Sequence, residues 1–161
     1  MGVPSHGFME ILERMKSWVR PTQMISNVLP GHLARALQGL LQSGLFRVYV
    51  NHGVIGCEVG GALKNVIALA AGLAEGLGTG YNTRSTVITR GLAELSRIGV
   101  AMGGEPATFS GLAGMGDLLA TCVSRHSRNR YVGELLGQGR SLDEIIFEMN
   151  MVAEGVKTSK A

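Results

Sequence analysis

The stretch from residue 58 to residue 72 constrains the fold more than any other part of this sequence, because it is long, apolar and almost free of charge. Between Glu58 and Glu75 the only charged residue is Lys64, which stands among Ala, Leu, Val, Ile and Gly residues. An apolar run of this length exceeds an ordinary strand and is typical of a buried helix. The sequence therefore predicts a central helix that carries one lysine.

Lys64 can be interpreted in two ways. In a buried position, the cost of desolvating its ammonium lowers the pKa, which suits a residue that exchanges protons near neutral pH as a general acid or base. Asn65 beside it would then orient a substrate oxygen, and Gly60 and Gly61 would let a ligand approach the backbone closely. Alternatively, the aliphatic stem of Lys64 covers apolar surface and its ammonium reaches water. The residues alone leave both interpretations open.

The composition favours a globular protein with closely packed helices. The chain of 161 residues is long enough for one core, or for one domain with part of another. Hydrophobic residues make up 45% and charged residues 17%, which excludes a disordered chain. Aromatic residues are scarce at 5%, whereas there are 24 glycines and 8 methionines. We therefore expect a core of small and aliphatic side chains.

The net charge indicates the class of ligand, and the cysteine usage indicates the cellular compartment. The net charge is +3, and the basic segment has no interleaved aromatic residues for base stacking, so a small phosphate ligand is favoured over nucleic acid. Cys57 and Cys122 lie far apart without metal-ligand spacing, so we expect no metal site and a reduced, cytoplasmic protein. No leader pattern is visible, and the apolar run, interrupted at Lys64 and Asn65, is expected to be too short to span a membrane.

Secondary-structure signals divide the chain near residue 50. The first part alternates helix and strand, with a helix over 8–19, a strand at 24–26, a helix over 33–41 and a strand at 46–50. From Val54 onward the patterns predict helices only. Glu105-Pro106 opens a short helix, and Ser141-Leu142-Asp143-Glu144 forms a capping-box pattern at the start of the last one. Residues 76–80 are glycine-rich but lack the preceding strand and third glycine of a nucleotide fingerprint, so they predict a connector, with Asn82 or Thr83 capping the next helix.

Asp117 is a second isolated charge, set in the glycine-rich and apolar segment 111–122. It stands near a predicted helix start, where a carboxylate can cap backbone N–H groups. A substrate contact is the alternative, and the sequence does not decide between them.

The segment Ser124-Arg125-His126-Ser127-Arg128-Asn129-Arg130 is the densest basic cluster in the chain. Arginine binds phosphate through a bidentate fork, and Ser and Asn add neutral donors, so this composition suits a phosphate ester. A solvated surface loop is the alternative. His126, alone among arginines, is interpreted as a surface residue.

Several short motifs, taken in order, resemble the NAD(P)-dependent sn-glycerol-3-phosphate dehydrogenase family over roughly residues 45 to 161. They are Gly60-Gly61-Ala62-Leu63-Lys64-Asn65, Asn82-Thr83-Arg84, Gly111-Leu112-Ala113-Gly114 with Gly116-Asp117-Leu118, Ser127-Arg128-Asn129-Arg130 and Ala153-Glu154-Gly155. The segment Val3-Pro4-Ser5-His6-Gly7-Phe8 also resembles a motif in the family's nucleotide domain.

This resemblance implies a fold and an activity. The family interconverts dihydroxyacetone phosphate and sn-glycerol 3-phosphate with NAD or NADP, for phospholipid synthesis. Its Rossmann domain precedes an all-helical substrate domain of the 6-phosphogluconate-dehydrogenase-like type. By resemblance, this chain is mainly α, with residues 1–50 a remnant of the dinucleotide-binding domain and residues 51–161 a substrate domain that lacks its carboxyl-terminal end.

The same resemblance assigns roles to particular residues. Lys64 would be the proton donor or acceptor at the substrate C2 oxygen. The residues implied in substrate binding are Asn65, Asp117, Ser127, Arg128 and Asn129. Those implied on the cofactor side are Arg128, Val152 and Glu154.

The sequence also departs from the family pattern. It contains no GxGxxG strand-turn-helix, and it passes from Ile25-Ser26 through Asn27-Val28-Leu29-Pro30-Gly31 directly to the helix over 33–41. The pyrophosphate turn and a second substrate-site lysine of the family are therefore missing. Two hypotheses follow: an enzyme of the family, or a non-catalytic helical module that binds glycerol phosphate or a partner chain. Exposed apolar surface on the shortened chain would favour self-association.

Overall fold

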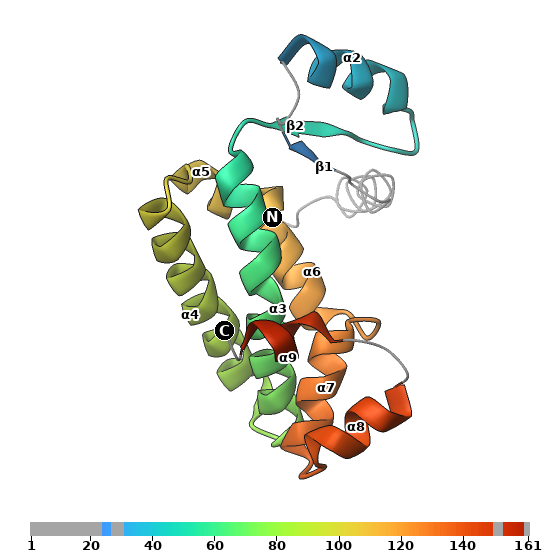
Figure 1. The fold of residues 1–161 in the computed structure, drawn as a ribbon, viewed down its shortest axis with the longest axis vertical. Coiled ribbons are helices and arrows are strands. Elements are labelled where there is room, and N and C mark those ends of the chain that lie inside the picture. The colour runs from blue at the N-terminus through green and yellow to red at the C-terminus, as the bar shows by residue number, and fades with distance from the viewer. Residues whose placement is uncertain (1–23, 27–30, 150–152, 160–161) are drawn as a thin grey trace, which may run out of the picture. The chain divides into compact units, whose positions relative to one another are not determined.

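The computed structural model describes residues 24–26, 31–149 and 153–159, and it divides the chain into two compact units, residues 1–54 and 55–161. The first unit contains two strands and a helix, and the second is helical throughout its described part (Figure 1). The predicted helix over 8–19 and the site residue Val152 lie outside the described residues. The mainly helical prediction is confirmed.

The first unit is a small α/β arrangement. Strand β1 (Met24–Ser26) pairs in parallel with β2 (Tyr49–Asn51), with Ile25 opposite Val50, and helix α2 (Gly31–Leu41) connects them. The Gln38 side chain donates a hydrogen bond of 2.8 Å to the Val48 carbonyl and so ties α2 to the approach of β2. The second strand begins later than predicted, because Phe46 instead forms an antiparallel bridge with Ser43 across a turn.

Helix α3 (Val54–Gly76) is the predicted central helix, and Figure 1 shows it between α4 (Gly80–Ala101) on one side and α7 (Arg128–Gly137) on the other. A Cβ on Gly72 would collide with the backbone carbonyl of Arg130, and one on Gly133 would collide with that of Leu69. Gly76 and Gly137 make similar contacts one turn further along. Because glycines line both sides of the contact, the two helix backbones touch directly.

Small and aliphatic side chains fill the second unit, as the composition predicts. One cluster of buried residues joins α3, α4 and α6 (Asp117–Val123), and consists of Ala68, Ala71, Ile88, Leu118 and Cys122. Another joins α7, α8 (Leu142–Met149) and α9 (Glu154–Thr158), and consists of Val132, Leu135, Ile145, Ala153 and Val156. The aromatic ring of Phe109, in α5 (Pro106–Ser110), is 1% exposed and occupies the space that a side chain at Gly99 would need.

Most predicted helix boundaries agree with the structure, and one is wrong. Ser141 and Glu144 form the predicted capping box at α8, since each backbone N–H donates to the other's side chain. However, α4 begins at Gly80 with Thr79 at its N-cap, so neither Asn82 nor Thr83 caps it. The positive φ of Gly80, 81°, is accessible to glycine, and the helix begins three or four residues earlier than the polar residues suggest.

Helix α3 is 23 residues long and contains an 18-residue window with a mean hydropathy of 1.5. By length and composition it could therefore cross a membrane, contrary to the prediction that the apolar run is too short. Length and composition do not distinguish a membrane span from the core helix of a soluble protein. Its backbone contact with α7 and its shared apolar cluster with α4 and α6 are those of a core helix.

Candidate functional site

Lys64 and Asp117 form an ion pair between α3 and α6. The Lys64 Nζ donates to the Asp117 Oδ2 at 2.5 Å, and the two side chains are 23% and 40% exposed. Asp117 is the first residue of α6 and follows a π-helical turn over Leu112–Gly116, and the N-cap residue of α6 is Gly116. The carboxylate therefore holds the lysine instead of capping the helix. Lys64 is accordingly neither fully buried nor alone in water.

A pocket of about 560 Å³ opens beside this pair, entirely within the second unit. Six of the residues implied by sequence line it, and Asp117 reaches it through its bond to Lys64. The six are Lys64, Asn65, Ser127, Arg128, Asn129 and Glu154. These residues come from α3, from the start of α7 and from α9, so the fold gathers residues up to 90 positions apart in the chain.

Two buried asparagines hold α9 against this pocket. The Asn65 Nδ2 donates to the Glu154 Oε2 at 3.2 Å, and the Gly155 backbone N–H donates to the Asn129 Oδ1 at 2.8 Å. Asn65 and Asn129 are 8% and 7% exposed. A Cβ on Gly155 would lie against the Asn65 carbonyl oxygen and the Asn129 Oδ1, so a glycine is required for this approach. Asn65 thus holds the Glu154 carboxylate, and Asn129 holds the backbone of the next residue.

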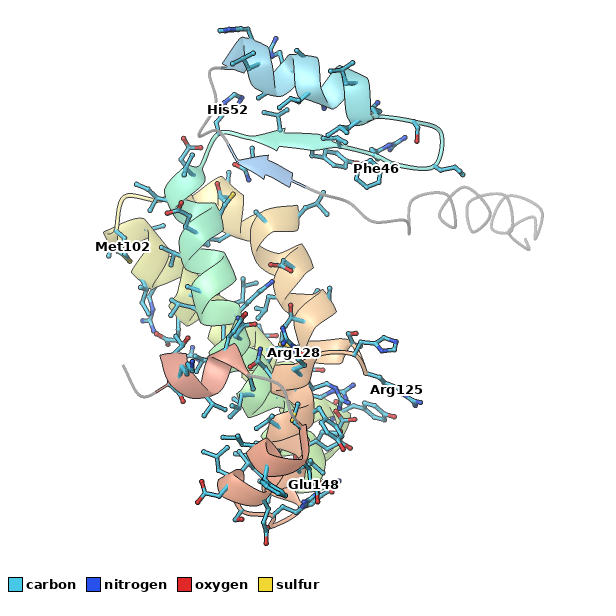
Figure 2. The ribbon with its side chains drawn as sticks, turned by 45° about the vertical axis from the view of Figure 1, so that its right-hand side comes forward. Phe46, His52, Met102, Arg125, Arg128 and Glu148 are labelled. Atoms are coloured by element: carbon cyan, nitrogen blue, oxygen red, sulfur yellow. The ribbon has the colours of Figure 1, made fainter. Side chains whose placement is uncertain are left out.

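The amino-terminal end of α7 supplies the cationic part of the pocket. The Ser127 Oγ accepts a hydrogen bond of 3.3 Å from the Arg130 N–H and caps the helix. Arg128, the first helical residue, is exposed and pairs with no acidic side chain among the described residues. Figure 2 shows Arg128 lying against the helices near α9, while Arg125 extends outward from the preceding loop. A helix amino terminus and a free guanidinium both favour an anion.

Arg130 belongs to the same basic segment but has a different role. Its side chain is 7% exposed; the guanidinium bonds Glu75 at 2.6 Å, Glu134 at 2.9 Å and the Ser124 carbonyl at 3.1 Å. Arg84 also reaches Glu75, at 3.0 Å. Burial alone would raise the pKa of Glu75, but the hydrogen bonds and charges of Arg130 and Arg84 outweigh it and lower that pKa below its ordinary value. The segment therefore contains two exposed arginines, Arg125 and Arg128, and one buried arginine, Arg130, that is held by the fold.

Sequence reasoning did not single out Thr121, which lines the pocket. His126, interpreted from sequence as a surface residue, lines the pocket as well, together with Ser124 of the same basic segment. Thr121 lies one turn after Asp117 and donates from its hydroxyl to the Asp117 carbonyl at 2.7 Å. Helical spacing from Asp117 would have placed Thr121 on the same face. His126 has no comparable signal, because its place depends on the path of the loop between α6 and α7. Within the described ranges, no group of His, Cys, Asp and Glu side chains is arranged to hold a metal ion.

Comparisons with known proteins show the family to which the helical unit is related. Residues 53–161 match the model of the NAD-dependent glycerol-3-phosphate dehydrogenase C-terminus. A glycerol-3-phosphate dehydrogenase [NAD(P)+] 2 of Sphingopyxis alaskensis is 47% identical over 208 residues, which covers 99% of this chain and 62% of the relative. The corresponding enzyme of Geobacter metallireducens is 58% identical over 141 residues, or 88% of this chain and 42% of the relative.

A solved structure of a glycerol-3-phosphate dehydrogenase is also similar to this chain. The crystal structure of glycerol-3-phosphate dehydrogenase from Coxiella burnetii superposes with a TM-score of 0.81 at 37% identity, over 87% of this chain and 43% of that one. This chain therefore spans less than two thirds of the length of these relatives. The alignment of 208 residues with the Sphingopyxis protein is longer than the chain of 161 residues, so that relative also carries a stretch that this chain lacks.

The matched model covers more than half of the chain, including the whole described part of the helical unit and every described residue of the pocket. The fold agrees with that of the solved relative over 87% of this chain. This chain belongs to the NAD(P)-dependent glycerol-3-phosphate dehydrogenase family.

Proposed function

We propose that this chain carries the substrate-binding and proton-transfer part of a glycerol-3-phosphate dehydrogenase, which interconverts dihydroxyacetone phosphate and sn-glycerol 3-phosphate for glycerophospholipid synthesis. The observation that carries the proposal is the pocket in which the Lys64–Asp117 pair and the amino terminus of α7 meet. A cytoplasmic, reducing location is part of the proposal. The two cysteines, Cys57 and Cys122, are free thiols, which is consistent with it.

The phosphate of the substrate binds at the start of α7. Arg128 offers a guanidinium with no competing carboxylate among the described residues, and Ser124 and Ser127 add hydroxyl groups along the same wall. Guanidinium binds phosphate through paired N–H donors, and the helix amino terminus adds a partial positive charge. The exposed end of the pocket suits the charged end of the ester.

Lys64 exchanges the proton at the C2 oxygen. When the ketone is reduced, its oxygen gains negative charge and takes a proton from the Lys64 ammonium; in the opposite direction the neutral amine accepts the proton of the alcohol. Asp117, 2.5 Å away, holds the Nζ in place. Asn65 follows Lys64 on α3 and lines the same pocket.

The family uses NAD(P), but the residues in this chain do not fit a whole dinucleotide. A pyrophosphate site requires a strand, a glycine-rich turn and a helix whose amino terminus receives the phosphates. Here β1 is followed by Asn27-Val28-Leu29-Pro30-Gly31, with one glycine, and β2 by His52-Gly53. Neither sequence forms the three-glycine turn. This mismatch favours the second candidate function, a non-catalytic module that binds glycerol phosphate or a partner chain.

The deciding experiment measures dihydroxyacetone-phosphate-dependent oxidation of NADH and of NADPH by the purified chain, together with its calorimetric affinity for glycerol 3-phosphate. Turnover that is lost in Lys64→Ala and retained in Lys157→Ala, whose lysine is exposed on α9, supports the enzyme. Binding without turnover supports the module. A folded chain that neither turns over nor binds glycerol 3-phosphate contradicts both forms of the proposal.

A further inference from the structure

The turn between α6 and α7 is held by hydrogen bonds and not by apolar packing. Its four residues, Ser124-Arg125-His126-Ser127, contain no apolar side chain, so hydrophobic burial does not fix their position. The Ser127 N–H closes the turn by donating to the Ser124 carbonyl at 3.1 Å. Ser124, His126 and Ser127 line the pocket beside Lys64, and Arg128 follows them in the same wall. The position of this turn therefore sets the position of the cationic wall.

Arg130 bonds both ends of the turn from inside the protein. Its Nε donates to the Ser124 carbonyl at 3.1 Å, the same oxygen that closes the turn, and its backbone N–H donates to the Ser127 Oγ at 3.3 Å. The Arg130 side chain is 7% exposed, so water competes little for its hydrogen bonds. Arg130 itself is not among the residues that line the pocket, so any effect that it has on a ligand passes through the turn.

Two carboxylates fix the position of the guanidinium. Its Nη1 donates to the Glu75 Oε2 of α3 at 2.6 Å and to the Glu134 Oε2 of α7 at 2.9 Å. Arg84 of α4 pairs with the same Glu75 oxygen at 3.0 Å. Arg84 belongs to the motif Asn82-Thr83-Arg84, whose residues do not line the pocket beside Lys64. The hydrogen-bonded series from Arg84 through Glu75 to Arg130 therefore connects that motif to the turn.

We propose that Arg130 is a positioning residue of the phosphate site, which holds the turn 124–127 and the start of α7 where Ser127 and Arg128 meet the phosphate. This inference rests on the proposed function, in which the phosphate binds at the start of α7. The two carboxylates neutralise the charge of Arg130, so attraction of the anion is left to Arg128. Without the bond to Ser124 the turn can occupy other positions, and a site that must be ordered on binding has a lower affinity.

Arg130→Lys tests the proposal, because lysine keeps the positive charge but lacks the forked guanidinium. One Nζ cannot occupy the places of both Nε and Nη1, so a lysine that pairs with Glu75 leaves the Ser124 carbonyl without its side-chain donor. Calorimetry would measure the Kd of glycerol 3-phosphate and the Kd of inorganic phosphate. We expect both values to rise by about fivefold to tenfold, because the turn meets the phosphate group itself.

Glu134→Gln is the matched control. It weakens the same ionic cluster but leaves the Nε bond of Arg130 to Ser124 in place, so it should lower stability and change the two Kd values by less than about twofold. Sucrose, which stabilises folded proteins, is added to every sample, and circular dichroism checks that each variant is folded before its Kd is measured. A loss of affinity in Arg130→Lys then does not come from unfolded molecules.

Two further measurements separate positioning from a purely structural role. The backbone N–H of Ser127, which is bonded to the Ser124 carbonyl, should exchange its hydrogen faster in Arg130→Lys than in Glu134→Gln. In an Arg128→Ala background, Arg130→Lys should cause a much smaller further loss of affinity, because the residue that it positions is gone. An unchanged Kd in folded Arg130→Lys, equal weakening in Glu134→Gln, or an undiminished loss in the Arg128→Ala background overturns this assignment while the proposed function stands. Failure of the wild type to bind glycerol 3-phosphate overturns the proposed function and this inference with it.

Discussion

Two ionic clusters lie along α3, and they are built from the same kinds of residue. One pairs Lys64 of α3 with Asp117 of α6, and the other pairs Glu75 of α3 with Arg130 of α7. They differ in what surrounds the cation. Lys64 is 23% exposed at the wall of a pocket and has one carboxylate partner, whereas Arg130 is 7% exposed and bonds two carboxylates and a carbonyl.

This difference separates a reactive group from a structural one. A buried cation that already makes several hydrogen bonds inside the protein is poorly placed to bind a ligand, and those hydrogen bonds stabilise the fold. A cation with one partner and an open side can still bind a substrate and exchange a proton with it. The comparison predicts that substitutions in the Arg130 cluster lower stability, and that substitutions at Lys64 or Arg128 lower binding or turnover.

The largest effect is expected at the close contact between α3 and α7, on which the Arg130 cluster depends. Gly72→Val places a side chain against the Arg130 backbone and forces α3 from α7, so the free energy of unfolding should fall by about 3 kcal/mol or more. Chemical denaturation measures the loss. Gly61→Ala, on the same helix with open space at its Cβ, should be neutral or slightly stabilising; equal losses in the two variants would show that the glycine contact is unimportant.

The Gly72→Val substitution should also change the reactivity of a buried thiol, that of Cys122. Burial raises the pKa of Cys122 to about 11, which keeps the thiol largely unreactive in the folded protein. In a Cys57→Ser background, Gly72→Val should therefore speed alkylation of Cys122 by increasing the population of open molecules. The labelling rate could stay unchanged although the free energy of unfolding is lower. That result would show that loss of the α3–α7 contact does not expose Cys122 in α6.

A smaller loss of stability should distinguish the two cations. Arg130→Met removes charged hydrogen bonds from a buried position and should cost about 2 kcal/mol of unfolding free energy. Lys64→Met removes one pair between partly exposed groups and should cost less than about 1 kcal/mol. Thermal melts of the two variants test this order, and the reverse order would contradict the division into structural and reactive clusters.

The smallest effect is the pH dependence that the Arg130 cluster gives to stability. Because the folded pKa of Glu75 is lowered, its contribution is fully present above the unfolded pKa of about 4.3 and is lost as the pH falls through the folded value. The stability advantage of the wild type over Glu75→Gln should be constant near neutral pH and shrink as the solution becomes strongly acidic. An advantage that grows on acidification would have the wrong sign.

The sequence predicted the elements whose signals are local. The apolar run gave α3, the capping box gave α8, and Pro106 at the first turn gave α5. The start of α4 was wrong because Gly80 takes a positive φ that no pattern of polar residues reveals. Glycine-rich composition predicted close helices, but the partners of Gly72 and Gly133 depend on tertiary packing and could not be read from spacing within either helix.

The sequence identified individual residues of the site but not the residues with which they interact. Isolated charges in apolar segments drew attention to Lys64 and Asp117, but nothing in the sequence indicated that the two would bond to each other across 53 positions. Composition could not separate Arg128 from Arg130, because both lie in one basic segment. Their separation follows from helix geometry: residues two apart face different directions, one toward the pocket and one toward Glu75.

The central claim is that Arg128 is the arginine of this segment that binds the phosphate, and a matched pair of variants tests it most directly. Calorimetry would measure the Kd of glycerol 3-phosphate for the wild type, for Arg128→Ala and for Arg125→Ala, whose exposed guanidinium extends away from the helices (Figure 2). Loss of a charged hydrogen-bonding pair should weaken binding by about tenfold or more in Arg128→Ala, with little change in Arg125→Ala. Equal weakening in both variants would show only general attraction of an anion to a basic loop, and unchanged affinity in Arg128→Ala would contradict the site itself.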